Sequence, residues 1–116
     1  MTFNKFEDME AWKLARILTR DIYASFGACR DYGFKDQIQR AAVSVMNNIA
    51  EGFDRNGCKE FMYFLRIAKG SSAEIRSMLY IAGDLGYLRV KNVEELSGLT
   101  VRVSQMLRKL IASQDK

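Results

Sequence analysis

The residue types and spacings that suggest chemistry in this chain are rows of lysine and arginine. Lys13, Arg16 and Arg20 follow one another at steps of three and four, which places them on one face of a helix. A second basic row, at steps of three to seven, consists of Lys59, Arg66, Lys69 and Arg76. Rows of this kind bind phosphates in nucleic acids. The alternative is a solvated face whose cations pair with some of the 14 acidic residues.

A line of hydrogen-bonding side chains is the second candidate site. Ser44, Asn48 and Glu51 recur at helical steps beside an apolar stripe. Ser71 and Glu74, from a later helix, are their expected neighbours. One interpretation is a site for a ligand or partner, and the other is a hydrogen-bonded layer that fixes the register of two helices. The pattern favours the structural layer and leaves the site open.

Catalytic chemistry finds little support in the sequence. The chain contains no histidine, which is the commonest general base and metal ligand. It also lacks phosphate-binding glycine loops and a nucleophile elbow. Lys69 near Ser71 and Ser72 could form a serine–lysine pair, but a solvated lysine and serines that serve helix packing explain the pattern better. Glu94 and Glu95 do not form an acid–base pair, because adjacent residues of a helix point apart. We therefore predict that the protein is not an enzyme, with no catalytic residues, no cofactor and no metal.

Length and composition indicate one helical domain. The chain has 116 residues, of which 48% are apolar and 28% charged, values that are ordinary for a globular protein. It contains no proline, which argues against a turn-rich β fold. The net charge of +4 permits contact with nucleic acid without requiring it.

Localisation is predicted from what the sequence lacks. Cys29 and Cys58 have no metal-ligand spacing and are expected to be reduced thiols. The start of the chain is polar and resembles no secretory signal, and no stretch reaches the ~18 apolar residues of a membrane span. A cytoplasmic protein that does not contact a membrane is expected.

Apolar residues with helical spacing define the elements that must position these side chains. Asp8 and Asn92 are expected to cap helices, and Gly86 is expected to end one in a left-handed conformation. The periodicity predicts four helices, at about residues 9–26, 35–53, 58–85 and 93–112.

Four amphipathic helices with short connections predict the fold class. The expected architecture is all-α, an antiparallel up-and-down four-helix bundle in a single domain. The first and third helices carry apolar side chains outside their main stripes. A helix that is apolar on several sides is buried on several sides, so these two helices predict contacts between subunits.

A combination of residues in the second and third helices suggests a family. It consists of Ser44-x-x-x-Asn48-Ile49-Ala50-Glu51-Gly52, Glu60-Phe61, Ile67-Ala68-x-Gly70-Ser71, Glu74 and Gly86-Tyr87. The sequence resembles, over nearly its whole length, the bacterial four-helix bundle proteins encoded within intervening sequences of 23S ribosomal RNA genes. It departs from the usual pattern at residues 45–47, where the family has Ile-Pro-Ala, and at Gln39, where an arginine is common.

The resemblance implies a homo-oligomer, with a pentameric ring as the expected form. The sequence is also similar to the accessory bundle protein of diversity-generating retroelements, which binds a reverse transcriptase and nucleic acid. Five copies with a charge of +4 would carry about +20 in total, which turns a weak basic stripe into a continuous basic belt. The family implies no enzymatic activity.

Two functions follow from the sequence as hypotheses. The first is a non-enzymatic oligomer that binds RNA or DNA through the two basic rows, without base specificity. The second is a protein-interaction scaffold or accessory subunit, for example for a reverse transcriptase, with no direct role in nucleic-acid binding.

Overall fold

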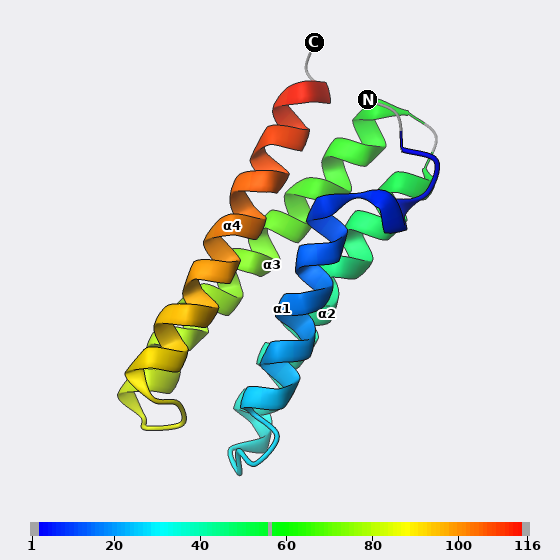
Figure 1. Ribbon diagram of the computed structural model, residues 1–116. Coiled ribbons are helices and arrows are strands. Elements are labelled where there is room, and N and C mark those ends of the chain that lie inside the picture. The colour runs from blue at the N-terminus through cyan, green and yellow to red at the C-terminus, as the bar shows by residue number, and fades with distance from the viewer. Residues whose placement is uncertain (1–2, 56, 115–116) are drawn as a thin grey trace.

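A computed structural model of the protein describes residues 3–55 and 57–114. Four long helices form an all-α four-helix bundle (Figure 1). A short 3-10 turn, η1 (Phe6–Asp8), precedes them. The helices are α1 (Glu10–Ser25), α2 (Tyr32–Asp54), α3 (Cys58–Asp84) and α4 (Val90–Gln114). The Cα positions extend over 44 × 20 × 20 Å, so the bundle is a short rod.

Each helix runs antiparallel to the one before it, as expected for an up-and-down bundle (Figure 1). Helices that follow one another in the chain pack side by side, and α1 closes the bundle against α4. Within the described residues, the backbones of α1 and α3 do not contact each other, because these helices occupy diagonal corners of the bundle. This diagonal arrangement decides which basic residues share a surface.

One apolar stripe from each helix builds the core. Leu18, Ile49, Leu65 and Leu107, one from each helix, are completely buried. Burial of an aliphatic side chain of this size stabilises the fold by about 1.5–3 kcal/mol. The stripes expected from the helical period are therefore the ones that meet in the centre of the bundle.

Two of the helix caps predicted from the sequence are wrong. Asp8 lies in η1, and α1 has Met9 at its N-cap position. Asn92 lies inside α4, because that helix begins at Val90. The side-chain cap occurs instead at Asp31, where the Phe34 amide donates to Oδ1 at 3.2 Å. This cap lets α2 begin at Tyr32, about three residues earlier than predicted.

The end of α3 follows its prediction. Gly86 has a φ of 77°, the left-handed conformation that glycine adopts without steric cost. The Tyr87 amide donates to the Ala82 carbonyl at 2.8 Å, and the Gly86 amide donates to the Gly83 carbonyl at 3.1 Å. These two bonds satisfy carbonyls that the end of a helix would leave unpaired.

One side-chain hydrogen bond ties together the two connections at the end of the bundle away from the chain termini. The Tyr87 hydroxyl donates to Asp31 Oδ2 at 2.6 Å, and the Tyr87 ring packs edge-on against Phe34 with centroids 5.4 Å apart. The Tyr87 hydroxyl, with a smaller contribution from the Phe34 amide, lowers the pKa of Asp31 below its usual range. The same bond raises the pKa of Tyr87.

Candidate nucleic-acid interface

The basic row of α3 lies on the outer surface of the bundle. Lys59, Arg66 and Arg76 are exposed, and Lys69 is half-buried. Lys69 and Arg76 flank Ser72 at steps of three and four, and the Ser72 hydroxyl donates to the Thr100 carbonyl of α4 at 3.1 Å. These two cations therefore border α4. Within the described residues, no cation of this row forms an ion pair with a carboxylate.

Helix α4 extends this surface with one cation, Arg108, that the sequence prediction missed as an interface residue. Ser104 Oγ donates to Ser72 Oγ at 3.1 Å, which fixes the antiparallel register of the two helices. In that register, Arg108 lies level with Arg66. We call the combined surface the α3–α4 basic face, and its residues are Lys59, Arg66, Lys69, Arg76 and Arg108. Arg102 and Lys109 lie on the other side of α4, where Lys109 lines a hollow with Glu10 and Ala11.

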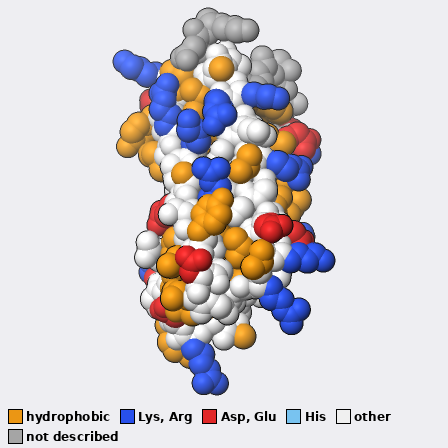
Figure 2. All heavy atoms as spheres, turned by 90° about the vertical axis from the view of Figure 1, so that its left-hand side faces the viewer, with side chains coloured by type: hydrophobic (Ala, Val, Ile, Leu, Met, Phe, Trp, Pro, Cys, Tyr) orange, Lys and Arg blue, Asp and Glu red, His pale blue; other side chains and the backbone are white. Residues whose placement is uncertain are grey.

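The cations on this side of the bundle are densest toward one end of the rod. Figure 2 shows Lys and Arg side chains gathered over the upper part of this side, near the chain termini. The lower part mixes acidic, basic and apolar side chains. Helix α4 carries Glu94 and Glu95 in its first turns, whereas Arg102, Arg108 and Lys109 follow without an acid between them. Positive charge is therefore concentrated where the later turns of α4 meet the earlier turns of α3.

The basic row of α1 is separate from this face. Lys13, Arg16 and Arg20 are exposed and, with Ile17, line a shallow hollow of about 400 Å³. Because α1 and α3 are diagonal in the bundle, this row lies on a different corner of the bundle from the row on α3. The residues that the sequence treated as one phosphate-binding set are thus divided between two surfaces.

Local contacts hold the α1 row in different ways. Lys13 Nζ lies 3.5 Å from Glu10 Oε1, and Arg20 Nε lies 3.7 Å from Asp21 Oδ1. Such exposed ion pairs contribute about 0–1 kcal/mol and exchange readily for other anions. The Arg16 guanidinium instead lies over the Trp12 ring, 5.7 Å from its centroid, and forms no ion pair with a described carboxylate.

The polar side chains of α2 and α3 make contacts within the seam between these helices. The Ser44 and Ser71 hydroxyls lie 3.0 Å apart across the seam. Asn48 Nδ2 donates to the Ser44 carbonyl at 2.8 Å and to Ser44 Oγ at 3.0 Å. All three side chains are partly buried. They satisfy one another, which is the geometry of a hydrogen-bonded layer, and its role in fixing register stays a prediction.

The two glutamates predicted for the same face form their hydrogen bonds outside that layer. Glu51 is exposed, and its Oε1 accepts from Arg55 Nη2 of the same helix at 2.8 Å. Glu74 Oε2 accepts from Gln37 Nε2 at 3.2 Å, also at an exposed position. Glu74 nevertheless lines one hollow of about 470 Å³ together with Ser44 and Ser71. The role of this group as a site for a partner stays a prediction.

The approach of α2 and α3 explains a glycine in the family pattern. A Cβ added at Gly52 would lie 2.7 Å from the Phe64 Cβ and 3.2 Å from the Phe61 ring. No real Cβ tolerates the shorter distance without movement of the backbone or the neighbouring side chain. Gly52 is therefore required by close helix packing.

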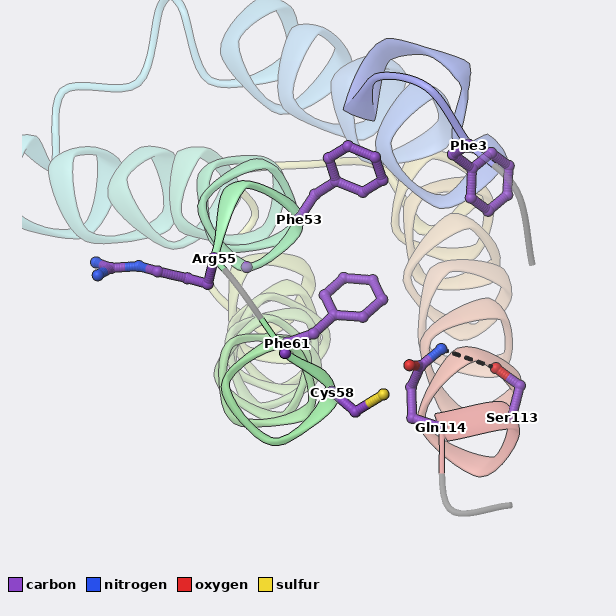
Figure 3. A pocket seen from close by; sticks show the side chains of 9 residues that line it. Phe3, Phe53, Arg55, Cys58, Phe61, Ser113 and Gln114 are labelled. Atoms are coloured by element: carbon purple, nitrogen blue, oxygen red, sulfur yellow. Dashed lines mark hydrogen bonds between the residues drawn. The ribbon is translucent and has the colours of Figure 1, made fainter.

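One hollow lies near the chain termini. It has a volume of about 450 Å³, and Phe53, Phe61 and Cys58 extend into it, whereas Arg55 points away (Figure 3). Gln114 Nε2 donates to Ser113 Oγ at 3.3 Å on the far wall. Within residues 3–55 and 57–114, no group of three or more acidic or cysteine side chains could hold a metal ion.

The two thiols are far apart in the fold. Cys29 lies in the connection between α1 and α2, and Cys58 begins α3 at the other end of the rod. Both are free, and their separation prevents a disulfide within one chain. None of the helices in the described part of the chain combines the length and apolar character that a membrane span needs.

Comparison with known proteins supports the fold and the family. A crystal structure of a protein of unknown function from the S23 ribosomal protein family of Bacteroides thetaiotaomicron has the same fold, with a TM-score of 0.82. It is 18% identical, and the match covers 87% of this chain and 97% of that one. No curated protein matches the chain. The family model described as 23S rRNA-intervening sequence protein matches residues 7–109, and the chain therefore belongs to this family.

Proposed function

We propose that this protein is a non-enzymatic oligomer that binds the phosphate backbone of RNA or DNA. The observation that supports the proposal is the α3–α4 basic face, whose cations form no ion pairs within the described residues. A cluster of like charges destabilises a compact fold by self-repulsion. Phosphates would neutralise these cations and release the counterions condensed on the nucleic acid, which favours binding.

The dimensions of the face fit a nucleic-acid backbone. From Lys59 to Arg76, the row on α3 extends over about 26 Å at the rise of an α-helix. Phosphates follow one another at about 3.4 Å along each strand of B-DNA, so this length spans roughly eight of them. The face offers charge along a line, and contacts to phosphates carry no sequence information directly, which favours binding without sequence specificity.

Self-association into a ring, with a pentamer as the expected form, is part of the proposal. Tyr63, Tyr80 and Ile81 on α3 are 60%, 59% and 43% exposed. Large apolar side chains at such exposure favour contact with another protein surface. In a ring, the basic faces of neighbouring copies would add to one electrostatic field.

The first test compares purified protein before and after nuclease treatment. Light scattering gives the mass, and the ratio of absorbance at 260 and 280 nm reports bound nucleic acid. We expect an oligomer whose absorbance ratio falls after nuclease treatment, and whose binding to labelled RNA or DNA weakens steeply with added salt. A protein that binds neither RNA nor DNA at low salt contradicts the proposal.

The same exposed side chains favour one alternative, a scaffold for another polypeptide. Tyr80, Ile81, Leu85 and Val90 are exposed near the end of the rod away from the chain termini. A pull-down that recovers one defined protein partner after nuclease treatment, from a chain that binds no nucleic acid, supports this alternative. Loss of that partner in a Tyr80→Ser/Ile81→Ser variant would assign the contact to α3.

A further inference from the structure

We propose that a single chain bridges two separate nucleic-acid segments, one on the α3–α4 basic face and one on the α1 row of Lys13, Arg16 and Arg20. This inference rests on the proposed binding of nucleic acid and adds a second, independent phosphate-binding surface. It assigns the α1 row a function of its own, because the fold keeps that row away from the larger face.

The diagonal placement of α1 and α3 is the first argument. The helices make no direct backbone approach, and α2 and α4 lie between them on either side. The cross-section of the bundle is about 20 Å between Cα extremes, with side chains extending beyond it. A straight duplex on the α3–α4 basic face therefore does not reach the α1 row, whose cations are left for a second segment.

The local structure of the α1 row is the second argument. Three cations and Ile17 surround a hollow of about 400 Å³ on one exposed face. Arg16 is held over Trp12, and Trp12 packs edge-on against Phe6 of η1 with ring centroids 5.1 Å apart. This stack restrains the guanidinium before binding, which lowers the entropy cost of ordering it on a phosphate. Arginine also binds phosphate oxygens in a bidentate manner.

The two surfaces should differ in their affinity for nucleic acid. Lys13 to Arg20 extends over about 10 Å, which corresponds to roughly three phosphates of one strand. The ion pairs of Lys13 with Glu10 and of Arg20 with Asp21 must also open for phosphates to bind. The α3–α4 basic face has more cations and no such pairs in the described residues. The first segment therefore binds the larger face, and the second segment binds the α1 row more weakly.

The experiment measures bridging directly. One short duplex is immobilised on beads, and a second duplex of the same sequence carries a fluorophore. The full-length protein is added at low salt, and the fluorescence retained on the beads reports bridging. Parallel arms use duplex DNA and duplex RNA. Binding of a single labelled duplex, measured by anisotropy, reports the α3–α4 basic face, and light scattering reports the mass of the protein.

The informative variant is Lys13→Gln/Arg16→Gln/Arg20→Gln. The matched control is Arg30→Gln/Arg89→Gln/Lys91→Gln, which removes the same charge from exposed positions in or near the connections between helices. The α1 variant should retain single-duplex affinity within about three-fold of the control, and its bridging should fall about ten-fold. Both variants should keep the mass of the wild type.

Three results would overturn the inference. Bridging retained by the α1 variant would show that multiple copies of the larger face suffice. Single-duplex affinity lost as strongly as bridging would make the α1 row part of one continuous surface. A changed mass would place the row in a contact between subunits. By contrast, wild-type protein that binds no single duplex would refute the proposed function itself.

Discussion

The α2–α3 seam and the α3–α4 basic face are both polar, yet only the seam satisfies its own polar groups. The Ser44 and Ser71 hydroxyls meet across the seam at 3.0 Å, and Asn48 donates to the Ser44 carbonyl and hydroxyl within α2 at 2.8 and 3.0 Å. The cations of the basic face form no ion pairs in the described residues. Satisfied groups hold helices together, whereas exposed cations without ion pairs stay available to anions from outside the fold. We therefore expect the seam to contribute stability and the face to contribute binding.

The largest expected effect comes from reversing charge on the basic face. Lys69→Glu/Arg76→Glu/Arg108→Glu should weaken binding of duplex DNA or RNA roughly 100-fold at low salt, because phosphates would meet anions. Fluorescence anisotropy measures the affinity. Arg30→Glu/Arg89→Glu/Lys91→Glu is the matched control, and an equal loss there would show that net charge, not the face, determines binding.

Two glycines of the bundle should respond oppositely to alanine. Gly52→Ala should lower the free energy of unfolding by about 1–3 kcal/mol, because its Cβ overlaps the Phe64 Cβ at 2.7 Å. A Cβ added at Gly70 would meet no atom outside the local helix backbone within 4 Å, so Gly70→Ala should raise the free energy of unfolding by about 0.5–1 kcal/mol through helix propensity. Urea unfolding at one protein concentration measures both. Stabilisation by Gly52→Ala would show that the seam is looser than the structure describes.

The hydroxyl pair in the seam should show coupling. Ser44→Ala and Ser71→Ala should each lower the free energy of unfolding by about 0.5–1.5 kcal/mol, since each leaves a partly buried hydroxyl with a lost partner. The double variant should lower the free energy of unfolding by less than the sum of the two single variants. Neither single variant should change nucleic-acid affinity. A large loss of affinity with unchanged stability would make the seam a binding site.

The smallest effect concerns the bond from the Tyr87 hydroxyl to Asp31. The folded state lowers the pKa of Asp31 below the usual 3.8, so this stabilisation is present above that pH and disappears as the pH falls through the folded value. The raised pKa of Tyr87 contributes below pH 10.0 and is lost as the pH rises through its folded value.

Thermal unfolding of Tyr87→Phe tests this contact. At neutral pH the variant should melt below the wild type, and the difference should shrink when the pH falls well below 3.8. It should also shrink above pH 10.0. A difference that is constant across both ranges would assign the effect to lost packing against Phe34 rather than to the hydrogen bond.

Most of the fold could be predicted from the sequence, because helical periodicity carries the information directly. The buried stripes and the left-handed stop at Gly86 depend on neighbours within one helix. The caps were predicted less well. Tyr32-Gly33 after Asp31 does not have the pattern of a helix start, so the beginning of α2 was predicted too late. Asn92 has the residue type of a cap, but it lies within α4.

The candidate interface depends on how helices lie beside one another, which one sequence does not specify. The sequence shows the rows on α1 and α3 but not that diagonal corners separate them. It also shows Arg108 without showing that the antiparallel register places it level with Arg66. Pairing of residues across helices, set here by Ser72 and Ser104, was therefore the missing information.

The most direct test of the central claim is the salt dependence of binding to duplex DNA. Wild type is compared with Lys69→Gln/Arg76→Gln/Arg108→Gln between about 50 and about 200 mM salt. Each lost phosphate contact should make the slope of log affinity against log salt shallower by about 0.9, so the variant should differ by about 3. Equal slopes for the two proteins would contradict binding through the α3–α4 basic face.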